Sequence, residues 1–261
     1  MALEHLTNDV LMKKYFGPQS EVGDKSIYLA ETPRITIQKR NPSIGKVSLH
    51  IRFFGHHVNS LEKTNPYYYT SQELKKWETK GTIPKKPDRT TFANFDQFFS
   101  KVFTLNSHLE FNNVIFNGGE PLLWQLDIAK CIRLSCEQFD NRKLTFDIET
   151  DGGIIIEPEI SDWFKRANIY IRAKNNMCPL LSQLTNHRSS RCNGWIHFEH
   201  NHWYVIFNYD TVSMDNINKC IKTYNLSKDK ILLESRKNMI ECMKLCIKNG
   251  YNYSVDLEGV A

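Results

Sequence analysis

The sequence predicts an α/β fold with a mostly parallel sheet built from about six strand–helix units. Two observations carry this prediction. Short β-branched and aromatic runs alternate with segments of helical periodicity, and glycine-bearing polar turns follow two consecutive strands. Strands that alternate with helices form βαβ units, in which neighbouring strands are parallel. The pattern fits an incomplete (β/α)6 barrel. An open doubly wound sheet stays open as the alternative, because periodicity alone does not separate the two.

The first strands are expected before the segment at 65–91. Residues 47–54 read VSLHIRFF, a β-branched and aromatic run that ends at Gly55 and predicts a central strand. Shorter alternating runs at 26–29 and 35–37 predict one or two strands before it. The later strands are expected at residues 113–117, 144–148, 169–171, 203–207, 230–233 and 253–255.

The helices are predicted from apolar residues at helical spacing between these strands. The clearest is the segment that follows Pro121, where six leucine and isoleucine side chains supply one apolar face. The expected helices cover residues 92–102, 122–134, 160–166, 213–223 and 235–249.

The domain organisation predicted is one partial barrel with two additions. Residues 1–25 mix charge, Gly and Pro and are expected to form an N-terminal extension to a single domain at 26–261. Residues 65–91 contain three prolines and a glycine and predict an inserted surface excursion.

Composition narrows the function classes. The chain has 261 residues, 41% of them hydrophobic, and no apolar run of the ~18 residues that a membrane span needs. Its start lacks the pattern of a secretory signal, and its seven cysteines are an odd number for a disulfide framework, so we expect a cytoplasmic protein. The net charge of +5 is too small to favour nucleic-acid binding, which would use Lys39, Arg40, Lys85 and Lys86.

Two polar turns mark a candidate site. Residues 117–121 read NGGEP at the end of one strand, and residues 147–153 read DIETDGG at the end of the next. The carboxyl ends of parallel strands meet at one edge of a sheet, where ligands bind. Glu120 could there accept hydrogen bonds from a cationic amine. Each motif alone is equally compatible with a strand-to-helix turn, with Pro121 at the first helical position.

Together with two amino-terminal segments, these motifs resemble a known family. GGEPLL and ETDGG, preceded by TIQKRNPSIG at 36–45 and IRFFGHHVNSLEKTNPY at 51–67, are similar to the 7-carboxy-7-deazaguanine synthases of the radical S-adenosylmethionine superfamily. The resemblance spans roughly residues 27–258. It implies the incomplete barrel of that superfamily. It also implies a residual S-adenosylmethionine-type pocket formed by Gly118, Gly119, Glu120, Glu149 and Lys174.

The departures from the family pattern concern its chemistry. Members hold a 4Fe–4S cluster with three cysteines spaced CxxxCxxC, and these positions are His56, Ser60 and Lys63 here. Such clusters need thiolate ligands, so the cluster is predicted to be absent. The substrate and magnesium positions are altered as well, with Gln38 retained and with Arg40, Asn59 and Asn65 as replacements.

Other potential metal ligands are predicted to be structural. Cys242 and Cys246 lie four residues apart on an expected helix, where cysteine behaves as a small core hydrophobe. Five histidines, at 56, 57, 197, 200 and 202, form no HxxxH or HExxH pattern, so no metal site is predicted.

The sequence thus favours a non-catalytic homologue of the synthase that acts as a binding, regulatory or structural subunit, with a protein partner or a second copy of itself. No resident cofactor is expected. The alternative is an enzyme of 7-deazaguanine metabolism that binds S-adenosylmethionine or a nucleotide-like ligand without a cluster of its own. The motifs do not carry activity by themselves, because fold similarity does not transfer function.

Overall fold

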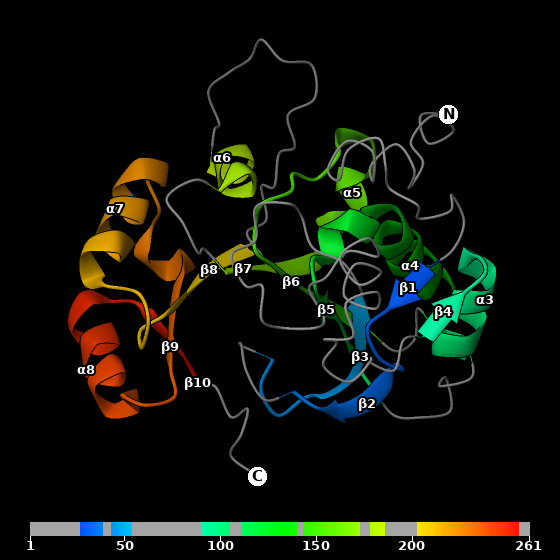
Figure 1. The fold of residues 1–261 in the computed structure, drawn as a ribbon, viewed down its shortest axis with the longest axis horizontal. Coiled ribbons are helices and arrows are strands. Elements are labelled where there is room, and N and C mark those ends of the chain that lie inside the picture. The colour runs from blue at the N-terminus through cyan, green and yellow to red at the C-terminus, as the bar shows by residue number, and fades with distance from the viewer. Residues whose placement is uncertain are drawn as a thin grey trace, which may run out of the picture.

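The computed structural model describes residues 27–38, 43–53, 90–104, 111–139, 143–172, 178–185 and 203–255. In this part of the chain ten strands form one sheet, in the order β10-β9-β8-β7-β6-β5-β3-β1-β4, with β2 paired to β3 off this path. Figure 1 shows the sheet as a curved layer with helices along its outer side.

Seven strands of the sheet are parallel and follow one another in chain order. A doubly wound sheet reverses its strand order at a switch point, whereas a barrel does not. The uninterrupted order therefore confirms the predicted incomplete barrel, which stays open between β10 and β4. The parallel strands are β3 (Val47–Phe53), β5 (Asn113–Gly118), β6 (Thr145–Thr150), β7 (Ala167–Arg172), β8 (Trp203–Asn208), β9 (Ile231–Ser235) and β10 (Asn252–Val255).

An antiparallel edge precedes the parallel strands. β2 (Arg34–Ile37) pairs with β3, and β1 (Ile27–Leu29) lies between β3 and β4 (Thr90–Phe92). β4 thus includes the last two residues of the expected excursion at 65–91 and the first residue of the expected helix at 92–102. The rest of that excursion and the expected extension at 1–25 lie outside the described residues. β4 has only three residues, which is too short for its alternation to be recognised in the sequence. It forms as a strand because it pairs with the edge of β1.

The helices agree with the predicted alternation, with two corrections. α6 (Pro179–Thr185) is an additional helix, and α8 begins at Met239 rather than at residue 235, because Ser235 still pairs with Val255 in the sheet. No helix in the described ranges is long and apolar enough to cross a membrane. The helices along the outer side, labelled in Figure 1, are α3 (Phe95–Phe99), α4 (Gln125–Gln138), α5 (Ser161–Phe164), α6, α7 (Met214–Tyr224) and α8 (Met239–Asn249), with short turns η2 (Ser100–Thr104), η3 (Pro121–Trp124), η5 (Pro158–Ile160) and η6 (Lys228–Lys230).

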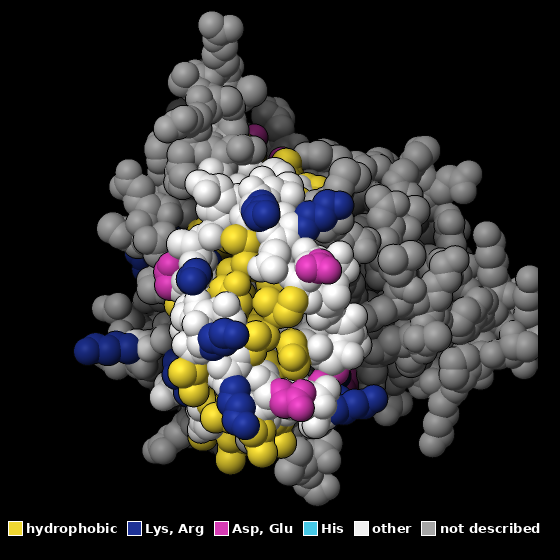
Figure 2. Space-filling model, turned by 90° about the vertical axis from the view of Figure 1, so that its left-hand side faces the viewer, with side chains coloured by type: hydrophobic (Ala, Val, Ile, Leu, Met, Phe, Trp, Pro, Cys, Tyr) yellow, Lys and Arg dark blue, Asp and Glu magenta, His cyan; other side chains and the backbone are white. Residues whose placement is uncertain are grey.

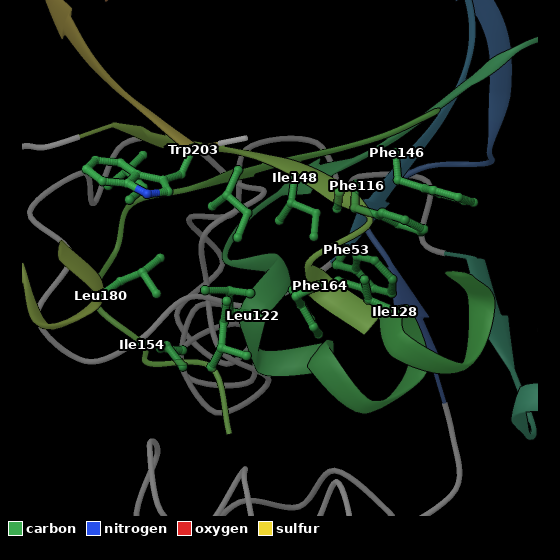
Figure 3. Packing of buried hydrophobic residues seen from close by; sticks show 14 of the residues in the cluster. Phe53, Phe116, Leu122, Ile128, Phe146, Ile148, Ile154, Phe164, Leu180 and Trp203 are labelled. Carbon is green, nitrogen blue, oxygen red and sulfur yellow. The ribbon is translucent and has the colours of Figure 1, made fainter. Parts of the chain in front are cut away.

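The hydrophobic core fills the space between the sheet and these helices. Figure 3 shows Phe116, Phe146 and Ile148 of the sheet pointing toward Leu122 and Ile128 of η3 and α4. Aromatic rings stack along this layer, with Phe53 lying 5.8 Å from the ring of Trp124. Such pairs add to the burial free energy and fix the spacing of strand and helix.

The cysteines belong to this core. Cys242 and Cys246 are buried at 0% and 2% exposure on the inner face of α8, which confirms their predicted packing role. The six cysteines within the described ranges are all free thiols.

Candidate functional site

The outer face of the curved sheet is apolar, whereas its inner face is mixed: polar and charged side chains flank a small apolar cluster of Tyr170, Ile206 and Leu232. Side chains alternate between the two faces along each strand. Leu49, Ile51 and Phe53 of β3 join the core beneath the helices, which leaves His50 and Arg52 on the inner face. We call this inner face the lumen. Its residues, on the strands that carry them, are Ser48, His50, Arg52, Asn113, Ile115, Asn117, Thr145, Asp147, Glu149, Asn168, Tyr170, Arg172, Tyr204, Ile206, Asn208, Leu232, Glu234, Asn252 and Ser254.

A hydrogen-bonded network occupies the amino-terminal end of the lumen. The carboxylate of Asp147 accepts hydrogen bonds from the side-chain amides of Asn113, at 3.0 Å, and Asn168, at 2.8 Å. Asn113 also contacts Ser48 and accepts a bond from Thr145. Burial raises the pKa of Asp147, while these donors act in the opposite direction. These side chains form hydrogen bonds with one another, so we infer that this layer has a structural role.

Charged side chains from three strands meet at the carboxyl-terminal end of the lumen. The guanidinium of Arg172 on β7 donates to Glu234 on β9, and its Nε lies 3.9 Å from the carboxylate of Glu149 on β6. The side chains of Glu149 and Glu234 are only 7% and 3% exposed. We call these three residues the lumen triad. A buried acidic pair is tolerated here because one arginine lies against both carboxylates.

A second ion pair and an amide complete this layer. Nε of Arg52 lies 3.5 Å from Glu31, with both side chains about one fifth exposed. Asn117 is 6% exposed, and its Oδ1 atom has no hydrogen-bond partner in the described part of the chain. The carboxyl-terminal end of the lumen is therefore charged. Its cationic side chains are Arg52 and Arg172, and its anionic ones are Glu31, Glu149 and Glu234.

Gly118 and Gly119 are explained by a close approach of two strands. Gly118 has a φ of +115°, and a Cβ atom there would lie 2.4 Å from the carbonyl oxygen of Phe53. The amide of Gly119 donates to that same oxygen at 3.0 Å. The glycine pair thus closes β5 against β3, a role that needs no ligand.

Glu120 acts within the chain as a helix cap and a tie between strand ends. It is fully buried, and its carboxylate accepts hydrogen bonds from the amides of Leu122 and Asp151 and from the hydroxyl of Thr150. Burial and the neighbouring Asp151 raise the pKa of Glu120 well above its ordinary value. These bonds confirm that the two glycine-bearing turns lie at one edge of the sheet.

The side chains of Glu120 and Glu149 nevertheless lie on opposite sides of the sheet. Glu120 binds Thr150, and successive residues of a strand point to opposite sides, so Glu149 faces the lumen while Thr150 does not. Both oxygens of Glu120 are engaged by the chain, and Glu149 lies against Arg172. The described residues are a poor fit to the predicted amine-binding role, and ligand binding by this set stays a prediction.

The remaining predicted site residues are only partly placed. Gln38 directly follows β2 and is 2% exposed; its amide donates to the carbonyl of Lys46, and its carbonyl accepts from the amide of Gly45. Lys174, the cluster positions His56, Ser60 and Lys63, and the replaced positions Arg40, Asn59 and Asn65 lie outside the described residues, as do the five histidines considered above. Among the described residues, no group of three or more His, Cys, Asp or Glu side chains could hold a metal ion.

Sequence analysis missed Arg172 and Glu234. The expected strands ended at Ile171 and Leu233, one residue short of each. The signal was present as continued alternation, since Asn168, Tyr170 and Arg172 share one face of β7. The pairing of Arg172 with Glu234 is not in the sequence, because the two residues are separated by 62 positions and by an intervening strand.

We expect Arg172→Ala to destabilise the fold by about 2 kcal/mol, because it leaves two buried carboxylates without their cation. The side chain of Arg172 is 24% exposed, which keeps the effect below that of a fully buried pair. Urea unfolding would measure the change. Lys165→Ala is the matched control, since Lys165 and Asp162 form an ion pair with side chains 43% and 83% exposed, and it should cost less than about 0.5 kcal/mol. Equal effects of the two substitutions would contradict a stabilising role for the lumen triad.

Comparison with known proteins shows the fold and leaves the family unassigned. No protein-family model matches the chain. A search of curated proteins also finds no match. Among solved structures, the chain is similar to QueE from Escherichia coli, with a TM-score of 0.59 and 15% identity over 88% of this chain and 93% of QueE. The chain therefore has an α/β fold of the incomplete-barrel kind found in QueE.

Proposed function

We propose that this chain is a non-catalytic relative of the 7-carboxy-7-deazaguanine synthases, which keeps their barrel and acts as a binding subunit. The lumen triad is the observation that carries the proposal. The resemblance also extends to residues 171–174, where the synthases have a strand end with a Ser-Pro-Lys pattern; there Lys174 matches the family lysine, and Arg172 stands in place of the small serine. The guanidinium then lies against Glu149, a residue that the resemblance assigns to the ligand pocket.

The ion pairs in the lumen support this proposal. A radical enzyme of this fold needs space at the carboxyl ends of its strands for a cofactor and a substrate. Here Arg172 reaches from β7 across β8 to Glu234, which is 2% exposed on β9. Opening such a pocket would separate buried ion-pair partners, which is costly.

The sequence at the cluster positions supports the proposal independently. His56, Ser60 and Lys63 stand where three cysteine thiolates are required, and a lysine ammonium repels an iron centre. Without a cluster there is no source of the electron that cleaves S-adenosylmethionine. The alternative, a ligand-binding enzyme without a cluster, has weaker support, because Gly118, Gly119 and Glu120 each have a structural role.

We expect the protein to remain colourless after anaerobic reconstitution with ferrous iron and sulfide. Iron analysis and visible absorption spectroscopy measure the outcome, and no charge-transfer bands of a cluster should develop. Stoichiometric iron with such bands would refute the proposal. The matched control is the triple variant His56→Cys, Ser60→Cys, Lys63→Cys, which restores the thiolate spacing and shows that the procedure can load a cluster.

The triple variant also tests the substrate positions. It should show no turnover of 6-carboxytetrahydropterin, because Arg40, Asn59 and Asn65 still differ from the family pattern. Calorimetry with S-adenosylmethionine separates the two proposed functions. No binding heat is expected for the wild-type chain, whereas saturable binding that Glu149→Gln removes would support the ligand-binding enzyme instead.

A further inference from the structure

The outer surface of α8 carries apolar side chains that do not pack against the core. Cys242 and Cys246 pack inward, while four aliphatic side chains of the same helix face water. These four are Met239, Ile240, Met243 and Ile247, with exposed fractions of 42%, 69%, 45% and 82%. Burying these exposed aliphatic side chains against a partner would remove apolar surface from water, which is favourable.

The exposed side chains form a stripe rather than a scatter. At about 100° per residue, Met239, Met243, Ile247 and Ile240 fall within one arc of about 100° on the helix, next to the buried side. Lys244 and Lys248 lie immediately beyond this arc. A helix that only covers a sheet needs one apolar face, so a second, adjoining one indicates a contact surface.

α7 lies on the same side of the molecule as α8 and also carries apolar side chains (Figure 1). Met214 and Ile221 of α7 are partly buried against the core. Figure 2 shows a band of apolar side chains on this side of the molecule, bordered by lysine and arginine side chains and also by acidic ones. Lysines outnumber acids on the two helices, with Lys219, Lys222, Lys244 and Lys248 against Asp215 and Glu241. We call this surface the α7–α8 face.

We propose that the α7–α8 face binds an acidic amphipathic helix of a partner protein. An apolar stripe of helical spacing matches the apolar side of such a helix, and the flanking lysines match carboxylates on its polar sides. Met239 and Met243 suit such a site because methionine adapts its shape to a partner. The inference rests on the proposed role as a binding subunit and names the surface that performs it.

Two other occupants fit the surface less well. A symmetric pairing of two copies would bring two lysine-rich surfaces together, which costs free energy. A membrane surface favours aromatic side chains at the interface, and the stripe consists of methionine and isoleucine alone.

The test uses the full-length protein and a labelled amphipathic peptide with leucines on one side and glutamates beside them. Fluorescence anisotropy should show saturable binding that weakens at high salt. Met243→Ala with Ile247→Ala should weaken it at least about tenfold, and so should Lys244→Glu with Lys248→Glu. Both alanine substitutions preserve helix propensity. Ile37→Ala, at another exposed aliphatic residue, is the matched control and should leave binding unchanged.

Several results would overturn the inference. The acidic peptide could fail to bind, or a version with lysines in place of the glutamates could bind equally well. Sedimentation could show a dimer that Met243→Ala with Ile247→Ala dissociates, or the protein could bind phosphatidylserine vesicles through the same residues. The peptide result is independent of iron content, so a cluster found on reconstitution would refute the proposed function while leaving the α7–α8 face to its own test.

Discussion

Gly118→Ala is expected to destabilise the protein by about 4 kcal/mol or more, enough to prevent folding of a domain of ordinary stability. An added Cβ would lie 2.4 Å from the oxygen and 2.8 Å from the nitrogen of Phe53. Both are backbone atoms of the central strand β3, so neither can move aside without breaking the β3–β5 pairing. The positive φ of +115° adds backbone strain. Urea unfolding, or soluble yield where the variant does not fold, measures the effect.

Gly45→Ala is the control that separates strain from collision. Gly45 also has a positive φ, +83°, but a Cβ there would meet nothing within 4 Å. Only the backbone strain of about 1 kcal/mol is expected. A Gly118→Ala variant as stable as Gly45→Ala would show that β5 does not approach β3 as described.

Glu120→Ala should cost about 3 kcal/mol, because it removes the acceptor of three hydrogen bonds inside the protein. The amides of Leu122 and Asp151 would lose their partner, and the tie from the start of η3 to the end of β6 would be lost. Glu120→Gln keeps the shape and one carbonyl oxygen, so it should cost less than half as much. Unfolding free energies of the two variants at one pH give the comparison. A smaller loss for alanine than for glutamine would argue against the capping role.

The same residue gives stability a pH dependence of known sign. Burial and Asp151 raise the pKa of Glu120 in the folded protein above its ordinary value of 4.5. The folded state therefore binds this proton more tightly than the unfolded chain does, and the resulting stability is complete below pH 4.5 and lost as the pH rises through the folded pKa. The advantage of wild type over Glu120→Gln should therefore shrink as the pH rises above 4.5. An advantage that grows over this range would have the wrong sign.

The sequence determined the alternation of the fold and the edge where the polar turns meet. In a strand such as residues 47–53, alternate side chains pack against the apolar core. This alternation can be read directly from the order of the residues. The motif similarity placed the chain in an incomplete barrel, in agreement with the strand order. It also implied that Glu120 and Glu149 belong to a site at that edge.

Only the tertiary structure decided what those residues contact. Glu120 became a cap because β6 brings Thr150 and Asp151 to it from 30 and 31 positions away. Glu149 acquired Arg172 as its neighbour because β7 lies beside β6, and Glu234 joined them from two strands further. A sequence records which side chains alternate along one strand, but the partner of a charged side chain depends on which strands are neighbours. That choice is made by the packing of the whole sheet against its helices.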